Sequence, residues 1–106
     1  DLAPESRVLV VGGGYIGLES AAVLRKLGHS VTVIEAMDRV LARVAGPELS
    51  AFYEAEHRAH GVEIVTGAGL ASLAAAGEAK LATLTDGRQI VADVVIVGIG
   101  IVPAVE

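Results

Sequence analysis

The sequence contains no cysteine and no tryptophan, and only one phenylalanine and two tyrosines among its 106 residues. The absence of cysteine excludes disulfides, thiolate metal sites and a redox-active dithiol within this segment. Because aromatic residues are so scarce, the core must be built from valine, isoleucine, leucine and alanine. That composition suits parallel strands covered by helices on both faces. At this length we expect one domain with a single core.

Basic side chains are also few, with 8 lysines and arginines against 13 aspartates and glutamates and a net charge of −5. Such a chain lacks the basic surface that nucleic acid binding requires. The longest apolar run, residues 94–105, contains two glycines and a proline, and it is shorter than the roughly 18 residues of a membrane span. No signal peptide is evident in the opening residues. We therefore expect a cytoplasmic protein that binds neither membrane nor nucleic acid.

Side chains suited to metal binding or acid–base chemistry do not cluster along the sequence. The three histidines, His29, His57 and His60, lie at or near the ends of predicted helices, without partners at metal-ligand spacing. We expect all three at the surface, where the helix dipole favours His57 and His60. No metal ligand and no catalytic side chain is predicted.

A glycine cluster near the start of the chain is its most informative feature. Gly12, Gly14 and Gly17 fit the pattern G-x-G-x-x-G, between an apolar run and a helical pattern. In that position the pattern predicts a dinucleotide site. Gly12 would permit the tight turn, Gly14 the close approach of a pyrophosphate, and Gly17 the close packing of the helix on the sheet. Free backbone N–H groups at the start of the helix would then face the phosphates.

An acid at the end of the second predicted strand completes this pattern. Glu35 follows the first glycine at close to the expected separation of roughly 20 residues. Its carboxylate can accept hydrogen bonds from both hydroxyls of the adenosine ribose and would repel a 2′-phosphate, which predicts NAD in preference to NADP. Arg39 and Arg43 lie beyond this strand. Each could receive a 2′-phosphate or contact adenine, or could be an ordinary surface arginine.

Turn and helix-end signals predict the remaining elements. Parallel strands are expected at residues 7–12, 30–35, 62–66 and 93–97, and helices at residues 15–27 and 47–60. Three shorter strands are expected at residues 70–75, 78–85 and 88–91. The predicted fold class is α/β, a Rossmann-like parallel sheet flanked by helices. A three-stranded antiparallel β-meander would form the crossover to the last parallel strand.

The run from Gly12 to Glu19 is similar to the NAD-binding domain of the flavoprotein pyridine-nucleotide reductases. Four later stretches resemble, more specifically, the ferredoxin reductases of oxygenase systems, of the putidaredoxin and rhodocoxin reductase type. These stretches are residues 33–36, 38–43, 51–53 and 97–103. The resemblance covers essentially the whole chain. It implies that residues 1–106 are the NAD(H)-binding domain of a larger FAD-dependent protein, with the FAD and C-terminal domains outside this segment.

The same resemblance assigns residues to the nicotinamide half of the coenzyme. Tyr15 and Ile16 would lie beside the nicotinamide, between it and the flavin pocket. Glu19 matches a family carboxylate that contacts the nicotinamide side, although a surface glutamate near a helix N-terminus is also favoured there without any ligand. Gly98 and Ile99 would pass beneath the coenzyme, where a bulky side chain would block it.

Other residues are assigned to the pyrophosphate and adenosine half. Gly12, Gly13 and Gly14, together with Gly17, would hold the pyrophosphate. Glu35 would bind the ribose, and Ala36 follows it in the matching stretch. Arg43 matches a family arginine near the adenine half.

In enzymes of this type NADH delivers a hydride to a flavin, which passes single electrons to a [2Fe–2S] ferredoxin. The resemblance therefore implies an NADH:ferredoxin reductase whose isolated segment would bind NAD but would not turn over. A first alternative is the NAD domain of another flavoprotein reductase, such as a nitrite reductase component or a disulfide reductase. A second alternative is a stand-alone NAD-binding module without a redox role.

Overall fold

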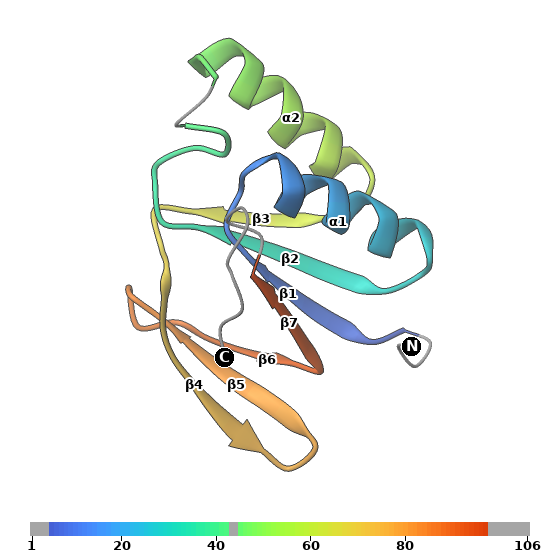
Figure 1. Cartoon of the computed structure of the whole chain (residues 1–106), viewed down its shortest axis with the longest axis vertical. Coiled ribbons are helices and arrows are strands. Elements are labelled where there is room, and N and C mark those ends of the chain that lie inside the picture. The colour runs from blue at the N-terminus through green and yellow to red at the C-terminus, as the bar shows by residue number, and fades with distance from the viewer. Residues whose placement is uncertain (1–4, 43–44, 98–106) are drawn as a thin grey trace.

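A parallel sheet and an antiparallel sheet make up the strands of the computed structural model, which describes residues 5–42 and 45–97 (Figure 1). The elements are β1 (Arg7–Val11), α1 (Tyr15–Lys26), β2 (Ser30–Glu35), α2 (Pro47–Ala59), β3 (Glu63–Thr66), β4 (Leu70–Ala76), β5 (Ala79–Leu84), β6 (Gln89–Ala92) and β7 (Val94–Val97). The predicted order of elements is confirmed, and each predicted boundary lies within one residue of the observed one.

The parallel sheet has the strand order β3-β2-β1-β7. Its register places Val8 beside Val31 of β2 and beside Val94 of β7. Strand β1 is therefore central, and its residues Val8, Leu9 and Val10 are at most 2% exposed. The chain moves from β1 outward to β2 and β3, and then returns to the other side of β1 with β7. This reversal puts a topological switch point at the carboxyl end of β1.

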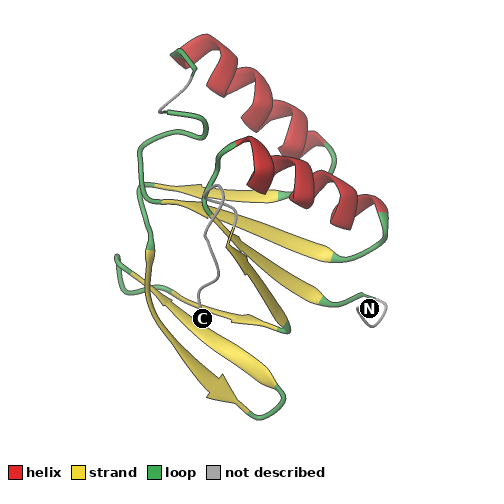
Figure 2. Ribbon diagram, viewed as in Figure 1, coloured by secondary structure: helices red, strands yellow, loops and turns green. Residues whose placement is uncertain are grey.

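The two faces of the parallel sheet are covered by different kinds of element (Figure 2). On one face Val8 and Val10 pack with Leu18 and Ala21 of α1. On the other face Leu9 packs with residues of the β4-β5-β6 meander and its flanking loops. The α/β class and the meander are confirmed, but the expectation of helices on both faces is wrong. Both helices lie on one face, because the meander buries the other.

Two residues after the end of each helix stands a glycine with a positive φ angle, +94° at Gly28 and +92° at Gly61. The Gly28 N–H donates to the Arg25 carbonyl at 3.0 Å, and the next N–H, that of His29, donates to the Leu24 carbonyl at 3.2 Å. The same pair of bonds closes α2 after Gly61. This arrangement is a Schellman motif, which satisfies carbonyls at the helix end and needs a residue that tolerates the left-handed region.

The prediction that all histidines lie at the surface is wrong for two of the three. His29 is 5% exposed, and its Nδ1 accepts the Ser6 N–H at 3.2 Å. His57 is 9% exposed, and its ring nitrogens lie 2.9 Å from the carbonyl oxygens of Leu18 and Tyr53. His60 is exposed, as expected. The buried rings are stabilised by backbone groups from distant segments, which local sequence does not reveal.

Neither helix within residues 5–42 and 45–97 has the length and apolar character that a membrane crossing would need. In the same ranges, histidine and carboxylate side chains nowhere gather in threes as a metal ion would require.

Candidate dinucleotide-binding site

The predicted glycine loop lies at the carboxyl end of β1, at the switch point of the parallel sheet. Open α/β sheets bind their ligands at such a point. Gly12 has φ +106°, a region that residues with a side chain rarely adopt, and its N–H donates to the Ile34 carbonyl at 2.8 Å. The turn that follows β1 therefore requires glycine at this position.

Gly17 brings α1 against the loop. A Cβ atom at this position would overlap the carbonyl oxygen of Gly12 and would lie 3.3 Å from Val10 Cγ1. Gly17 is itself buried. The close contact between helix and strand that the third glycine predicts is present in the structure.

The amino end of α1 is open to an anion. Gly14 is its N-cap residue, with an extended backbone and no side chain to bond the first N–H groups. The N–H groups of the first turn have no acceptor within the helix, and no acidic residue lies in that turn. Helix α2 differs, since Pro47 removes one N–H and Glu48 places a carboxylate in the first turn. Of the two, α1 has the end that suits a phosphate.

The side chains assigned to the nicotinamide half lie on the first turns of α1. Tyr15 is 43% exposed and Ile16 is 50% exposed. The Tyr15 ring packs edge-on against the Tyr53 ring of α2, with centroids 5.9 Å apart. Glu19 is exposed. The structure therefore presents these side chains to solvent beside the open end of the helix.

Glu35, the last residue of β2, is bonded directly to the glycine loop. Its Oε1 accepts the Gly13 N–H at 2.7 Å, and its Oε2 accepts the Met37 N–H at 2.8 Å. A carboxylate oxygen has two acceptor positions, so each oxygen retains one for another donor. The carboxylate is half-buried and held in one orientation between two segments.

The segment after β2 packs on the glycine loop, a feature that the sequence did not reveal. The Leu41 N–H donates to the Gly13 carbonyl at 2.9 Å, although Leu41 has φ +57° and no glycine marks this bend. A Cβ atom on Gly13 would lie 3.0 Å from Val40 Cγ1. The Val40 N–H in turn donates to Glu54 Oε2 of α2 at 3.1 Å. Only the tertiary contacts determine this path.

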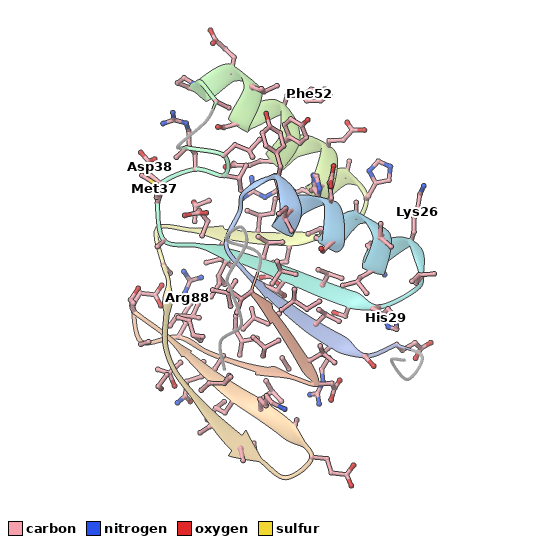
Figure 3. All side chains as sticks on the ribbon, viewed as in Figure 1. Lys26, His29, Met37, Asp38, Phe52 and Arg88 are labelled. Atoms are coloured by element: carbon pink, nitrogen blue, oxygen red, sulfur yellow. The ribbon has the colours of Figure 1, made fainter. Side chains whose placement is uncertain are left out.

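Ala36 is exposed and begins this segment. The carbonyl of Met37 accepts the Gly67 N–H at 2.7 Å, which joins the segment to the loop after β3. In Figure 3, Met37 and Asp38 lie at one end of β2 and His29 lies at the other. Ala36 thus belongs to the same end of the sheet as the glycine loop.

Three assigned residues, Arg43, Gly98 and Ile99, lie outside the described residues. In the sequence Gly98 and Ile99 directly follow β7, which ends at Val97.

A separate groove of about 590 Å³ lies between the carboxyl-terminal halves of α1 and α2. Ala22, Lys26 and His60 are among its lining residues. Helix carboxyl ends carry partial negative charge, so the groove is less suited to a phosphate than the start of α1. We therefore place the candidate site at the glycine loop.

Comparison with known proteins identifies the family. The model of the family described as pyridine nucleotide-disulphide oxidoreductase matches residues 1–106. The chain belongs to this family. This match confirms the resemblance of the run from Gly12 to Glu19 to the flavoprotein pyridine-nucleotide reductases.

Ferredoxin reductases are among the known proteins that are similar to this chain. The ferredoxin reductase subunit of 5,5'-dehydrodivanillate O-demethylase from Sphingobium sp. is 62% identical over 105 residues, which are 96% of this chain and 25% of that protein. A ferredoxin reductase from Rhodopseudomonas palustris superposes with a TM-score of 0.86 at 38% identity, over 92% of this chain and 24% of the other. The chain therefore spans about a quarter of the length of these relatives.

A third neighbour is an engineered water-forming NADPH oxidase bound to NADPH. It superposes with a TM-score of 0.83 at 27% identity, over 90% of this chain and 21% of the other. It is a mutant of a Lactobacillus brevis enzyme that is a water-forming NADH oxidase. Five residues of the parent are replaced in it: three consecutive ones, Asp, Ala and Met, by Ala, Arg and Ser, and in addition a Gly by Ala and a Pro by Arg.

Proposed function

We propose that this chain is the NADH-binding domain of an FAD-dependent reductase that passes electrons from NADH to a [2Fe–2S] ferredoxin. The observation that carries the proposal is the open amino end of α1 at the switch point, with Glu35 bonded to the adjoining loop. The ferredoxin reductases among the relatives support the electron acceptor. The chain spans about a quarter of such proteins, so we assign the flavin to the remainder.

The glycine loop and the first turn of α1 would hold the pyrophosphate. The N–H groups of Tyr15 and Ile16 are available as donors because the first N–H bonded within the helix is that of Leu18, which donates to the Gly14 carbonyl. The partial positive charge at this helix end favours the diphosphate without any basic side chain. Gly14 leaves room for the phosphate next to the backbone. Gly17 supports this arrangement by allowing α1 to start close to Gly12.

Glu35 would select the ribose. Its two oxygens each retain one acceptor position beside the Gly13 and Met37 bonds, which matches a pair of neighbouring hydroxyls. A 2′-phosphate in the same place would meet a fixed carboxylate. The bond to Gly13 also keeps the ribose and pyrophosphate positions in register with each other.

The engineered oxidase supports the preference for NAD. Three of its five substitutions replace the consecutive run Asp-Ala-Met of an NADH enzyme, and the five together accompany NADPH binding. This chain has the similar run Glu35-Ala36-Met37 at the end of β2. An acid followed by two uncharged residues is the NADH-type pattern of that pair.

Tyr15, Ile16 and Glu19 would line the nicotinamide end, with Gly98 and Ile99 beneath it, and Arg43 would lie near the adenine. In the proposed activity the coenzyme supplies a hydride, whose two electrons leave singly through the flavin to ferredoxin. This chain's own residues position the coenzyme and provide no acid, base or nucleophile for that transfer.

Calorimetric titration of the chain with NADH and with NADPH tests this proposal. We expect NADH to bind at least about tenfold more tightly, a difference of roughly 1.4 kcal/mol, because Glu35 accepts ribose hydroxyls and repels a phosphate. Glu35→Gln should reduce the preference. Glu78→Gln, which removes one negative charge from the exposed β4–β5 turn, should leave it unchanged. Equal affinities for the two coenzymes in the unmodified chain would refute the role of Glu35.

A further inference from the structure

Arg39 lies four residues after Glu35, and its guanidinium is bonded to α2. Its Nε donates to Ser50 Oγ at 3.2 Å, and its Nη2 donates to the Ala45 carbonyl at 3.1 Å. Asp38 lies 3.9 Å from Nη1, but its side chain is 86% exposed. An ion pair as exposed as this one contributes little to the stability of the arrangement. Ser50 and Ala45 are therefore the partners that fix the guanidinium.

The position of Arg39 gives these bonds a consequence for coenzyme choice. In dinucleotide-binding sheets an arginine near the end of the second strand can accommodate a 2′-phosphate. Among residues 36–42 and 45–46, the described part of the segment after β2, Arg39 is the one basic side chain. Its fork of N–H donors suits a phosphate. In this structure one of those donors is committed to Ser50 of α2 and another to the Ala45 carbonyl, just before α2.

Ser50 is well placed to hold the arginine. It is 1% exposed and sits in the first turn of α2, where its N–H donates to the Gly46 carbonyl at 3.1 Å. A buried hydroxyl costs free energy unless it is hydrogen-bonded. The Arg39 Nε donates a hydrogen bond to the Ser50 hydroxyl, and the same bond holds the guanidinium against the helix.

We propose that Ser50 is a specificity-determining residue, which keeps Arg39 bonded to α2 and so prevents it from serving as a ligand for a 2′-phosphate. This inference rests on the proposed binding of NADH at the glycine loop. It goes beyond that proposal because it assigns the rejection of NADPH to two features, the Glu35 carboxylate and an arginine held out of reach. Removing the Ser50 hydroxyl frees Nε and leaves the guanidinium held by the Ala45 carbonyl alone. With one bond in place of two, the side chain can turn toward the nucleotide more readily.

The test is a double-mutant cycle of Ser50→Ala and Arg39→Ala, with dissociation constants measured for both NADH and NADPH. We expect Ser50→Ala to bind NADPH about three- to tenfold more tightly and NADH within about twofold of the unmodified chain. The gain should disappear in the double variant, because it depends on the guanidinium. Ser72→Ala on the exposed strand β4 is the matched control and should change neither constant.

If Ser50→Ala does not fold, Ser50→Cys replaces it, because a thiol fills similar space and is only a weak acceptor. A folded variant whose NADPH affinity is unchanged overturns the inference. The same conclusion follows if the affinities for both coenzymes change equally, or if the gain persists without Arg39. In each of these cases NADH binding by the unmodified chain leaves the proposed function standing. Absence of NADH binding by the unmodified chain would instead remove both proposals.

Discussion

The close contact between α1 and the glycine loop depends on the absence of a side chain at Gly17. A Cβ atom here would overlap the Gly12 carbonyl oxygen, which belongs to the backbone and cannot rotate away. We expect Gly17→Ala to lower the free energy of unfolding by about 1–3 kcal/mol, the usual range for overpacking. NADH affinity should fall as well, since α1 can no longer start beside the loop. Urea unfolding and calorimetric titration measure the two effects.

Gly46 provides the control for that substitution. It is the N-cap of α2, with φ −76° and nothing within 4 Å of an added Cβ. Gly46→Ser adds a Cβ to open space and supplies a capping oxygen. It should leave the stability unchanged or slightly increased. If it destabilises as much as Gly17→Ala, the contact at Gly17 is not the cause.

Individual residues differed in how far the sequence could predict them. Gly12, Gly17 and Glu35 lie where their spacing predicted. The two glycines are required by the local backbone, and Glu35 is fixed by the end of strand β2. His57 was missed, since its surroundings come from Leu18 of another helix. The left-handed conformation of Leu41 was also missed, because its bond to Gly13 is a contact between separate loops.

The two glycines that end the helices allow a comparison between elements. Gly28 has nothing within 4 Å of an added Cβ, whereas at Gly61 that atom would lie 2.6 Å from Arg25 Nε. Gly28→Ala should cost about 1 kcal/mol for its left-handed backbone alone. Gly61→Ala should cost about 1 kcal/mol more, because it displaces Arg25 from the His60 and His29 carbonyls.

Urea unfolding of both variants, in the unmodified chain and in an Arg25→Ala background, measures this difference. The two alanine substitutions should become equally costly once Arg25 is removed. Equal costs while Arg25 is present would show that its bonds do not support the end of α2.

Strand and helix boundaries were predictable because glycine and proline mark most of them. The course of the segment between β2 and α2 was not predictable, although the sequence placed Arg39 and Arg43 beyond the second strand. Its course depends on Val40 bonding Glu54 and on Arg39 bonding Ser50, which join residues from different elements. No local pattern encodes such pairs, and the same bonds carry the inference about coenzyme choice.

At the scale of the whole molecule, Arg7 at the start of β1 is bonded to Asp93, which lies between β6 and β7. The Asp93 carboxylate accepts the Arg7 backbone N–H at 2.7 Å, and its two oxygens bond the guanidinium at 3.1 and 3.0 Å. These bonds lower the pKa of Asp93 from 3.8 to about 2. The carboxylate must therefore stabilise the fold above pH 4, and that stabilisation is lost as the pH falls toward 2.

We expect Asp93→Asn to melt below the unmodified chain at pH 7, with the two melting temperatures converging between about pH 4 and pH 2. Thermal unfolding across this pH range measures the effect. Glu78→Gln is the control, because it removes one carboxylate from the exposed β4–β5 turn, away from Arg7 and Asp93. A difference at Asp93 that is independent of pH would contradict the role of its charge.

The arrangement of layers was only partly predictable. The aliphatic composition pointed to a sheet buried on both faces, which is what the structure has. It could not show that the meander covers one of those faces, since Leu9 would be equally buried against a helix. The position of the candidate site is independent of that difference, because it depends on the strand order around β1.

The most direct test of the proposed site is an NMR titration of the isotopically labelled chain with NADH. We predict that the largest amide shifts fall on the glycine loop, the first turn of α1 and residues 36–37. The backbone of Gly14 is extended and tolerates a side chain, so the Gly14→Val variant should keep the spectrum of a folded protein. It should lose the NADH-induced shifts, because the valine side chain occupies the space of the phosphate. The account would be contradicted if NADH produced no shifts, or if the largest ones fell at the groove of Ala22, Lys26 and His60.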